Sequence, residues 1–460
     1  MPKKSKKQRP PAVTRLSDLD IMHPDAAGID VAADFHVVAV ATADRQSVEV
    51  RSFGACTADL EAMAAWLAQA GCTTAAMEST GVYWIPLYDL LESKGFQVLL
   101  VDPRQVRNVP GRPKTDVQDA QWIRRLHSLG LLRGAFRPEE DFRVLRCYLR
   151  QRANLVRYAA NHILHMQKAL EQMNVKLTEA VSDVTGKTGM GIIKAILAGQ
   201  RDPKALAKLR DPRCKQDEEQ LARALEGTWR PEHLFELKQA VELYEAYRSR
   251  LAECDQQIEA HLGTLANPKA GEPPPTAKKR QRRRSNDPAF DARRRLYKVA
   301  KVDLTEIEGV EAGTALVLLG EIGADVSKWS SSKKFCAWLG LCPQTRESAG
   351  KVLSSKVRAG PGRAGQALRM AANSLQSSKS ALGAFFRRIA ARAGRAKAVT
   401  ATAHKLGRLV YALLKHGQEY VATGQEEYEK QYRERAARNL ARKAKEMGFE
   451  LKAIEEQGQA

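Results

Sequence analysis

The sequence lacks the signatures of several large protein classes. Its seven cysteines form no CxxC pair and are odd in number, which argues against a disulfide framework and against a zinc cluster. There is also no HExxH motif and no GxxxxGK[ST] loop, so the common zinc-protease and phosphate-loop ATPase patterns are missing. We expect the cysteines to be reduced core residues.

Long apolar runs are absent as well. No window approaches the roughly 18 uninterrupted apolar residues of a membrane-spanning helix, and no apolar signal-peptide region follows the start. We therefore expect a cytoplasmic protein that does not associate with a membrane.

What the sequence has in excess is positive charge. Its 460 residues include 75 Lys and Arg against 53 Asp and Glu, a net charge of +22. An excess of this size indicates a polyanionic partner, and nucleic acid is the leading candidate. The length allows two or three domains with separate cores.

The first part of the chain predicts a mixed sheet. Residues 1–25 form a basic arm, which we expect to be disordered. GIDVA, HVVAVATAD and SVEVRSF then read as three antiparallel strands. A helix, the strand TTAAMES, a second helix, the strand QVLLVDP and the helix DVQDAQWIRRLHSL follow. This order is the one found in ribonuclease-H-like domains, and we assign such a domain to residues 26–137.

Acidic residues stand where that fold holds metal ions. Asp30 lies in the first strand, Glu78 closes the fourth, and Asp116 with Asp119 opens the last helix. Asp116 and Asp119 alone have an ordinary explanation, since acidic residues favour the first turn of a helix. Together, four carboxylates predict a site for two Mg²⁺ ions about 4 Å apart. Other nearby acids have simpler roles in turns or at a strand end: Asp34, Asp44 and Asp102.

Residues 138–266 predict a helical, coiled-coil domain. Two series of apolar residues repeat every seven positions, the first at Phe142, Leu149, Val156, Ile163, Leu170 and Leu177, the second at Leu237, Tyr244, Leu251, Ile258 and Leu265. The two helices either return antiparallel as a stalk or pair between subunits. Because an apolar seam is costly to leave in water, we expect a homo-oligomer, a dimer or tetramer. A Gly-punctuated helical insert separates them, and a Pro-rich, basic linker spans 267–299.

Residues 300–424 predict a second, mainly helical domain, followed by a charged helical tail at 425–460. LTEIEGVEAGTALVLLGEIG has the spacing of a helix-hairpin-helix, although Glu311 stands where a second hairpin Gly is usual. GPGRAG at 360–365 matches a dinucleotide fingerprint, but no βαβ unit surrounds it. Because Arg358, Arg363 and Arg369 crowd it, we interpret it as a turn that introduces a helix beside nucleic-acid phosphate.

Several segments resemble one family. They are GIDVAADFHVVAV, MESTGVYWIPLYDLL, VDPRQVRNVPGRPKTDVQDAQWI and, later, FCAWLGLCPQTRESAGK with LRMAANSL. These are similar to the DEDD transposases of the insertion-sequence family whose members are recombinases guided by a bridge RNA. The resemblance covers most of residues 26–177 and 300–420. It implies a RuvC-like domain, a coiled coil and a C-terminal transposase domain.

The resemblance also implies site residues. The four acids correspond to Asp30, Glu78, Asp116 and Asp119, and a serine nucleophile corresponds to Ser348 in ESAGK, where Ala349 replaces the usual first Gly. By sequence alone Ser354 or Ser355 could serve as well. The arginines expected to hold structured RNA or DNA are Arg104, Arg107, Arg112, Arg150, Arg152, Arg157, Arg358, Arg363 and Arg369.

The sequence therefore predicts a prokaryotic DNA recombinase that mobilises an insertion sequence and associates with the nucleoid when bound to DNA. Its expected partners are donor and target DNA and a structured guide RNA. One alternative is a RuvC-like hydrolytic endonuclease, in which water attacks directly. Another is a non-catalytic nucleic-acid-binding protein with a relic nuclease fold.

Overall fold

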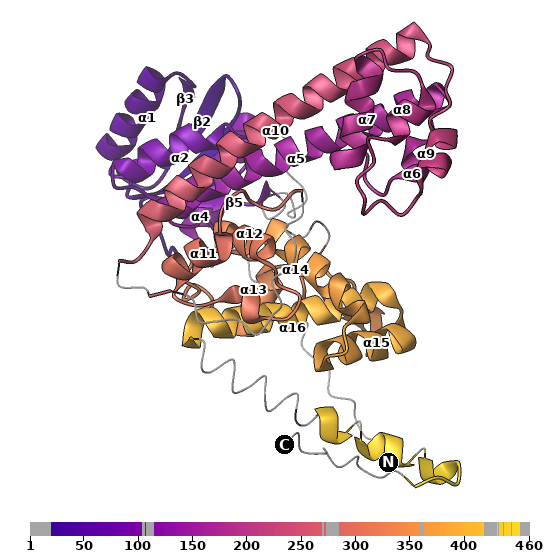
Figure 1. Ribbon diagram of the computed structural model, residues 1–460. Coiled ribbons are helices and arrows are strands. Elements are labelled where there is room, and N and C mark those ends of the chain that lie inside the picture. Colours follow the sequence, from indigo (N-terminus) through magenta and orange to yellow (C-terminus); the bar gives the residue numbers. More distant parts are fainter. Residues whose placement is uncertain are drawn as a thin grey trace. The chain divides into compact units, whose positions relative to one another are not determined.

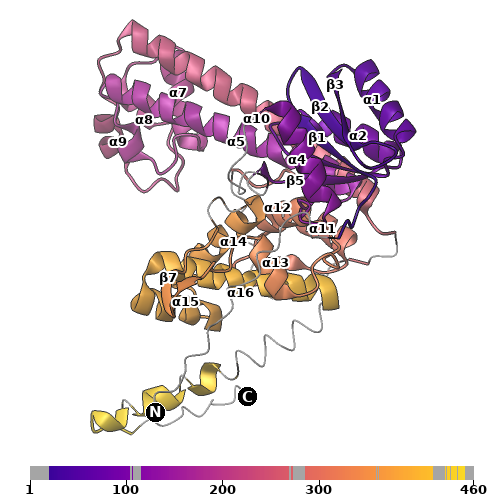
Figure 2. The same cartoon turned by 180° about the vertical axis from the view of Figure 1, so that it is seen from behind.

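The computed structural model describes residues 20–103, 106, 115–268, 271–272, 285–358, 360, 362–417, 430, 432–435, 437–442 and 444–450. The chain divides into two compact units, residues 1–137 and 138–460, and each is described by itself (Figures 1 and 2). Among the described residues, no helix is both long and apolar enough to cross a membrane.

The first unit is built on one mixed sheet. Its strands are β1 (Ala26–Val31), β2 (Phe35–Ala41), β3 (Val48–Gly54), β4 (Thr74–Glu78) and β5 (Gln97–Val101). Their spatial order is β3-β2-β1-β4-β5, with β1 to β3 antiparallel and both β4 and β5 parallel to β1. The predicted ribonuclease-H-like fold is thereby confirmed.

Alternating side chains give the sheet two apolar faces. On one face, Ile29 and Met77 pack with α1 (Thr57–Gln69) and α2 (Trp84–Ser93). On the other, Ala39 and Ala76 belong to small clusters that include residues of α4 (Asp116–Ser128). Successive residues of a strand point to opposite faces, so each strand contributes to both layers.

Helix α4 lies unusually close to the centre of the sheet. A Cβ added to Gly28 in β1 would lie 2.6 Å from the Cα of Arg124 and closer still to the backbone oxygen of Ala120. Any larger residue at this position would therefore meet helix backbone. Glycine at position 28 lets α4 rest directly on β1.

The carboxyl end of α4 is fastened to the start of β4. The Thr74 hydroxyl donates its one hydrogen to the Gln97 carbonyl at 2.8 Å. In the 2.9 Å hydrogen bond between Thr74 Oγ1 and His127 Nε2, the histidine N–H is therefore the donor. Burial, followed by the nearby His23, lowers the pKa of His127 to about 4. His127 is therefore neutral at neutral pH.

This histidine predicts acid sensitivity of the first unit. Between pH 6.5 and 4 an unfolded chain binds a proton at His127 that the folded chain excludes, so stability is lost as pH falls through this window. The free energy of unfolding falls by about 3 kcal/mol between pH 6.5 and 4. Urea unfolding at about pH 7.5 and about pH 5, read by hydrogen exchange in β4 and α4, should show about 2 kcal/mol of this loss. His127→Gln keeps an N–H donor without a titrating group and should show a shallower pH dependence; equal slopes would contradict the assignment.

The second unit contains the long helix pair. Helices α5 (Glu140–Gln172) and α10 (Pro231–Leu265) run antiparallel, since the Tyr148 ring lies 6.0 Å from that of His261 and the Tyr158 ring 5.7 Å from that of Tyr247. The predicted coiled-coil stalk is confirmed in its intrachain form.

This pairing changes two sequence expectations. Leu177 lies beyond the end of α5, in α6 (Leu177–Ala180), so it is not part of the α5 seam. The seam is also covered from within the chain: Leu170 of α5 and Leu237 of α10 belong to one buried cluster. An uncovered seam therefore no longer argues for self-association.

The insert between the long helices is a small helical bundle. It comprises α6, α7 (Lys187–Leu197), α8 (Pro203–Ala207) and α9 (Glu218–Ala224). Ile192 of α7 and Leu221 of α9 pack in the same cluster as Leu170. The insert thus folds around the end of the stalk where α5 finishes and α10 begins (Figure 1).

The remainder is mainly helical, as predicted. It contains α11 (Ala292–Ala300), the 3-10 turn η2 (Leu304–Glu306), α12 (Ala312–Ile322), α13 (Ser332–Trp338), the hairpin β6 (Arg346–Ser348) and β7 (Lys351–Ser354), α14 (Arg363–Ser374), the 3-10 turn η3 (Leu375–Ser377), α15 (Ala381–Ala393) and α16 (Arg395–His416). Helix α11 includes residues that the sequence assigned to the linker.

Two motifs of this region can be located. A Cβ at Gly309, in the expected helix-hairpin-helix, would lie 2.9 Å from the Ala371 carbonyl of α14, so the turn packs closely on protein backbone. Its contact with DNA stays a prediction. In GPGRAG, Gly362 is the N-cap of α14, and the segment introduces a helix as expected.

Candidate active site

The carboxyl edge of the sheet brings Asp30 and Glu78 side by side. Strands β1 and β4 are parallel neighbours, and Ile29 pairs with Met77 at the end of their register. Asp30 and Glu78 are the next residue on each strand. In a parallel sheet both side chains therefore emerge from the same edge.

Both acids belong to the face that α4 covers. Asp30 is two residues beyond Gly28, which lies against α4, and Glu78 is two residues beyond Ala76, which clusters with Ile123 of that helix. Side chains two apart on a strand share a face. Asp30 and Glu78 thus lie on the helix side of the sheet.

The direction of α4 brings its acids to the same edge. His127, near the end of the helix, is bonded to Thr74 at the start of β4, so the helix runs antiparallel to β1 and β4. Its first turn, with Asp116 and Asp119, consequently lies toward the carboxyl ends of the strands. The Thr115 side chain caps this turn by accepting from the Gln118 N–H at 3.3 Å.

The four carboxylates share an edge without forming a finished ligand cluster. Asp30, Glu78 and Asp119 are half-buried and Asp116 is exposed. Within the described part of the chain, no three His, Cys, Asp or Glu side chains are arranged to hold a metal ion. The donor set fits Mg²⁺, which prefers carboxylate oxygens, but ligation requires the side chains to turn toward one another.

Ser348 lies at the tip of a hairpin in the second unit. It pairs with Lys351 across a two-residue turn, in which Ala349 has φ 48° and Gly350 has φ 74°. Positive φ at both positions is what a type I′ turn requires, so the turn forms with alanine at its first position. The Ser348 side chain is exposed. Ser354 is half-buried, and its hydroxyl accepts from the Lys356 N–H at 3.3 Å.

Comparisons with known families match both the segment that contains the four acids and the segment that contains Ser348. Residues 27–175 match a DEDD domain of the IS110 type, described as a transposase. Residues 302–387 match a domain described as transposase IS116/IS110/IS902 family. The chain belongs to the IS110 family of transposases. It is thus a DNA transposition enzyme of an insertion sequence. A comparison with curated proteins gives no match.

The first match of this IS110-family transposase contains all four acids, and the second contains Ser348. Reasoning from the sequence did not identify Gly28, because its role depends on contact with the distant helix α4. The available signal was a glycine inside a predicted strand, which often marks close backbone approach.

The arginines proposed for nucleic-acid contact fall into different settings. Three of them lie outside the described residues: Arg104, Arg107 and Arg112. Arg157, Arg358 and Arg363 are exposed. Arg369 donates to the Gly340 carbonyl at 2.9 Å, and burial lowers its pKa.

Two stalk arginines have partners within the transposase. Arg150 makes a two-pronged contact with the Glu321 carboxylate of α12, at 3.1 and 3.0 Å. Arg152 pairs with the buried Asp255 of α10, at 2.5 and 3.3 Å. These guanidinium groups hold elements of the second unit together. Their contact with nucleic acid stays a prediction.

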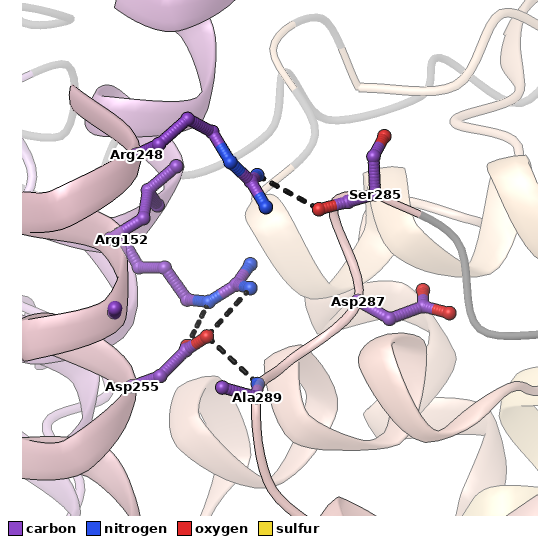
Figure 3. A pocket seen from close by; sticks show the side chains of 8 residues that line it. Arg152, Arg248, Asp255, Ser285, Asp287 and Ala289 are labelled. Atoms are coloured by element: carbon purple, nitrogen blue, oxygen red, sulfur yellow. Dashed lines mark hydrogen bonds and ion pairs between the residues drawn. The ribbon is translucent and has the colours of Figure 1, made fainter. Parts of the chain in front are cut away.

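The Arg152–Asp255 pair borders a cavity of about 340 Å³ (Figure 3). Asp255 also accepts from the Ala289 N–H at 2.8 Å, and Arg248 donates to the Ser285 carbonyl at 2.8 Å. In the sequence Arg152, Arg248 and Asp255 interrupt the heptad series. Here Arg248 and Asp255 bind the main chain of residues 285–289, within the predicted linker. We assign this cavity a structural role.

Proposed function

We propose that this transposase cleaves and rejoins DNA with four carboxylates and a serine nucleophile, guided by a structured RNA. The observation that carries the proposal is the placement of four acids from β1, β4 and α4 at one edge of a ribonuclease-H-like sheet. Matches to transposase domains over residues 27–175 and 302–387 support it.

Asp30, Glu78, Asp116 and Asp119 are the residues that would hold the ions. Two bound Mg²⁺ ions would supply charge stabilisation at the oxygens around phosphorus. The protein's own contribution is to fix the spacing of the carboxylates, through the β1–β4 register and the close seat of α4 on Gly28.

Ser348 is proposed to attack the phosphorus of the scissile linkage. A bond forms between its Oγ and phosphorus, and the bond from phosphorus to one deoxyribose oxygen breaks. The serine proton passes to water, and the released deoxyribose oxygen takes up a proton. The phosphoserine ester conserves the bond for rejoining when a new DNA hydroxyl attacks it.

The guide RNA and the oligomer belong to the same proposal. The net charge of +22 supports extensive phosphate contact, and the exposed Arg157 of α5 is a candidate for it. More than 200 residues separate Ser348 from Asp119. The nucleophile and the acids therefore meet either within one folded chain or between subunits of a dimer or tetramer, and light scattering of the RNA-bound protein gives the subunit count.

A covalent adduct tests the proposal. The full chain is mixed with Mg²⁺, labelled element-end DNA and RNA transcribed from the flank of the gene, and is then denatured. We expect label on the protein, located by peptide mass spectrometry at Ser348. Ser348→Ala should lose the adduct and strand exchange but keep binding, whereas Ser355→Ala should behave like wild type. A scrambled RNA should reduce cleavage strongly.

Other outcomes would contradict the proposal at separate points. Strand cleavage without any adduct would favour direct attack by water, as in a hydrolytic endonuclease. An adduct at Ser354 or Ser355 would show that the wrong serine has been assigned. Equal activity with a scrambled RNA would remove the guide from the proposal.

A further inference from the structure

The hairpin that carries Ser348 projects from its unit. Every residue from 343 to 353 is exposed, including the apolar side chains of Val352 and Leu353. Its base is tied by a bridge between Pro343 and Val357 and by the Gln344 N–H, which donates to the Lys356 carbonyl at 2.9 Å. Because its residues are exposed on both strands, the hairpin can contact a partner surface (β7 is labelled in Figure 2).

The pairing register sorts the side chains of the hairpin by charge. Ser348 lies directly opposite Lys351, so these two side chains share a face. Arg346 is two residues before Ser348 on the same strand and shares that face too. The one acid of the hairpin, Glu347, pairs with Val352 on the opposite face.

The hairpin contains a β-bulge, which does not move Arg346 off the face of Ser348. The register shifts between Arg346 and Glu347, because Arg346 pairs with Ser354 while Glu347 pairs with Val352. The extra residue is therefore Leu353, on β7. Strand β6 itself alternates regularly, which keeps Arg346 on the serine face.

We infer that Arg346 and Lys351 bind the DNA phosphate that Ser348 attacks. The inference rests on the proposed role of Ser348. A phosphodiester carries one negative charge, which its two non-bridging oxygens share. Two exposed cations beside the Ser348 hydroxyl can bind these oxygens, and the only carboxylate of the hairpin lies on its opposite face. The cations draw the phosphate to the serine and stabilise the negative charge that grows on its non-bridging oxygens during attack.

Charge-neutral variants and a charge-neutral substrate together test this inference. Lys351→Met and Arg346→Met should each slow adduct formation by about 100-fold on ordinary DNA. Lys351→Arg should recover most of the rate. On DNA with a methylphosphonate at the cleaved linkage, which carries no charge to bind, each Met variant should differ from wild type by less than about threefold.

The matched control is Lys356→Met, which removes the same charge from the base of the same hairpin. It should stay close to wild type on both substrates. Full activity of Lys351→Met and Arg346→Met on ordinary DNA would overturn the inference, as would an equal defect on both substrates. Ser348→Ala run alongside separates the two claims: an adduct in that variant would remove the proposed nucleophile itself.

Discussion

Asp30→Asn is expected to reduce DNA cleavage by about 1,000-fold or more while leaving the sheet folded. Asp30 sits at the end of β1 beside Glu78, at the edge toward which α4 directs Asp116 and Asp119. An amide is a poor ligand for Mg²⁺ compared with a carboxylate. Glu78→Gln, Asp116→Asn and Asp119→Asn should show losses of the same order in a labelled-strand cleavage assay.

Metal binding gives a second readout that does not depend on turnover. Mn²⁺ added as a probe should bind the wild type, as followed by electron paramagnetic resonance, and bind Asp30→Asn more weakly. The control is Asp34→Asn, an exposed acid four residues later in the turn after β1, which should cleave and bind Mn²⁺ normally. Wild-type cleavage by Asp116→Asn in Mg²⁺ would show that the acidic edge is not the site.

Gly28→Ala is expected to destabilise the first unit by about 3 kcal/mol or more. The added Cβ would meet the backbone of Arg124 and Ala120, and backbone cannot rotate out of the way as a side chain can. Helix α4 would have to leave the sheet, and its acids would move away from Asp30 and Glu78. Cleavage should therefore fall together with stability.

Gly54→Ala is the matched control for this prediction. A Cβ at Gly54, at the end of β3, would lie 2.8 Å from the Asp59 carboxyl carbon, and that flexible side chain can move. Hydrogen exchange of the full-length variants, read in β1 and α4, should show faster exchange for Gly28→Ala than for Gly54→Ala. Equal protection in the two variants would contradict the close packing of α4 against Gly28.

The first unit could be predicted well because its signals are local. Runs of apolar residues such as Ala26–Val31 and Thr74–Glu78 specify strands, and the Thr115 cap specifies the start of α4. Once the strand order indicated a ribonuclease-H-like sheet, the ends of the strands located Asp30 and Glu78. Ser348 was assigned as the nucleophile only through the family resemblance, since nothing in the local sequence distinguishes it from Ser354.

The stalk shows where a local signal stops. The heptads of α5 and α10 specify two amphipathic helices, but a seven-residue repeat is the same whether its partner belongs to the same chain or to another. The intrachain pairing becomes visible only in tertiary contacts, such as those of Tyr148 with His261 and of Tyr158 with Tyr247. Arg152 and Asp255 read as defects in the heptads, yet they pair with each other.

By itself, the sequence determined the order of strands and helices, the acids at the strand ends and the excess of positive charge, because each follows from residue type and short-range periodicity. The tertiary structure alone decided three things: how closely α4 approaches Gly28, which arginines have protein partners, and which cations share a face with Ser348. These depend on residues that meet only after folding and on pairing registers that a shift of one residue would reverse.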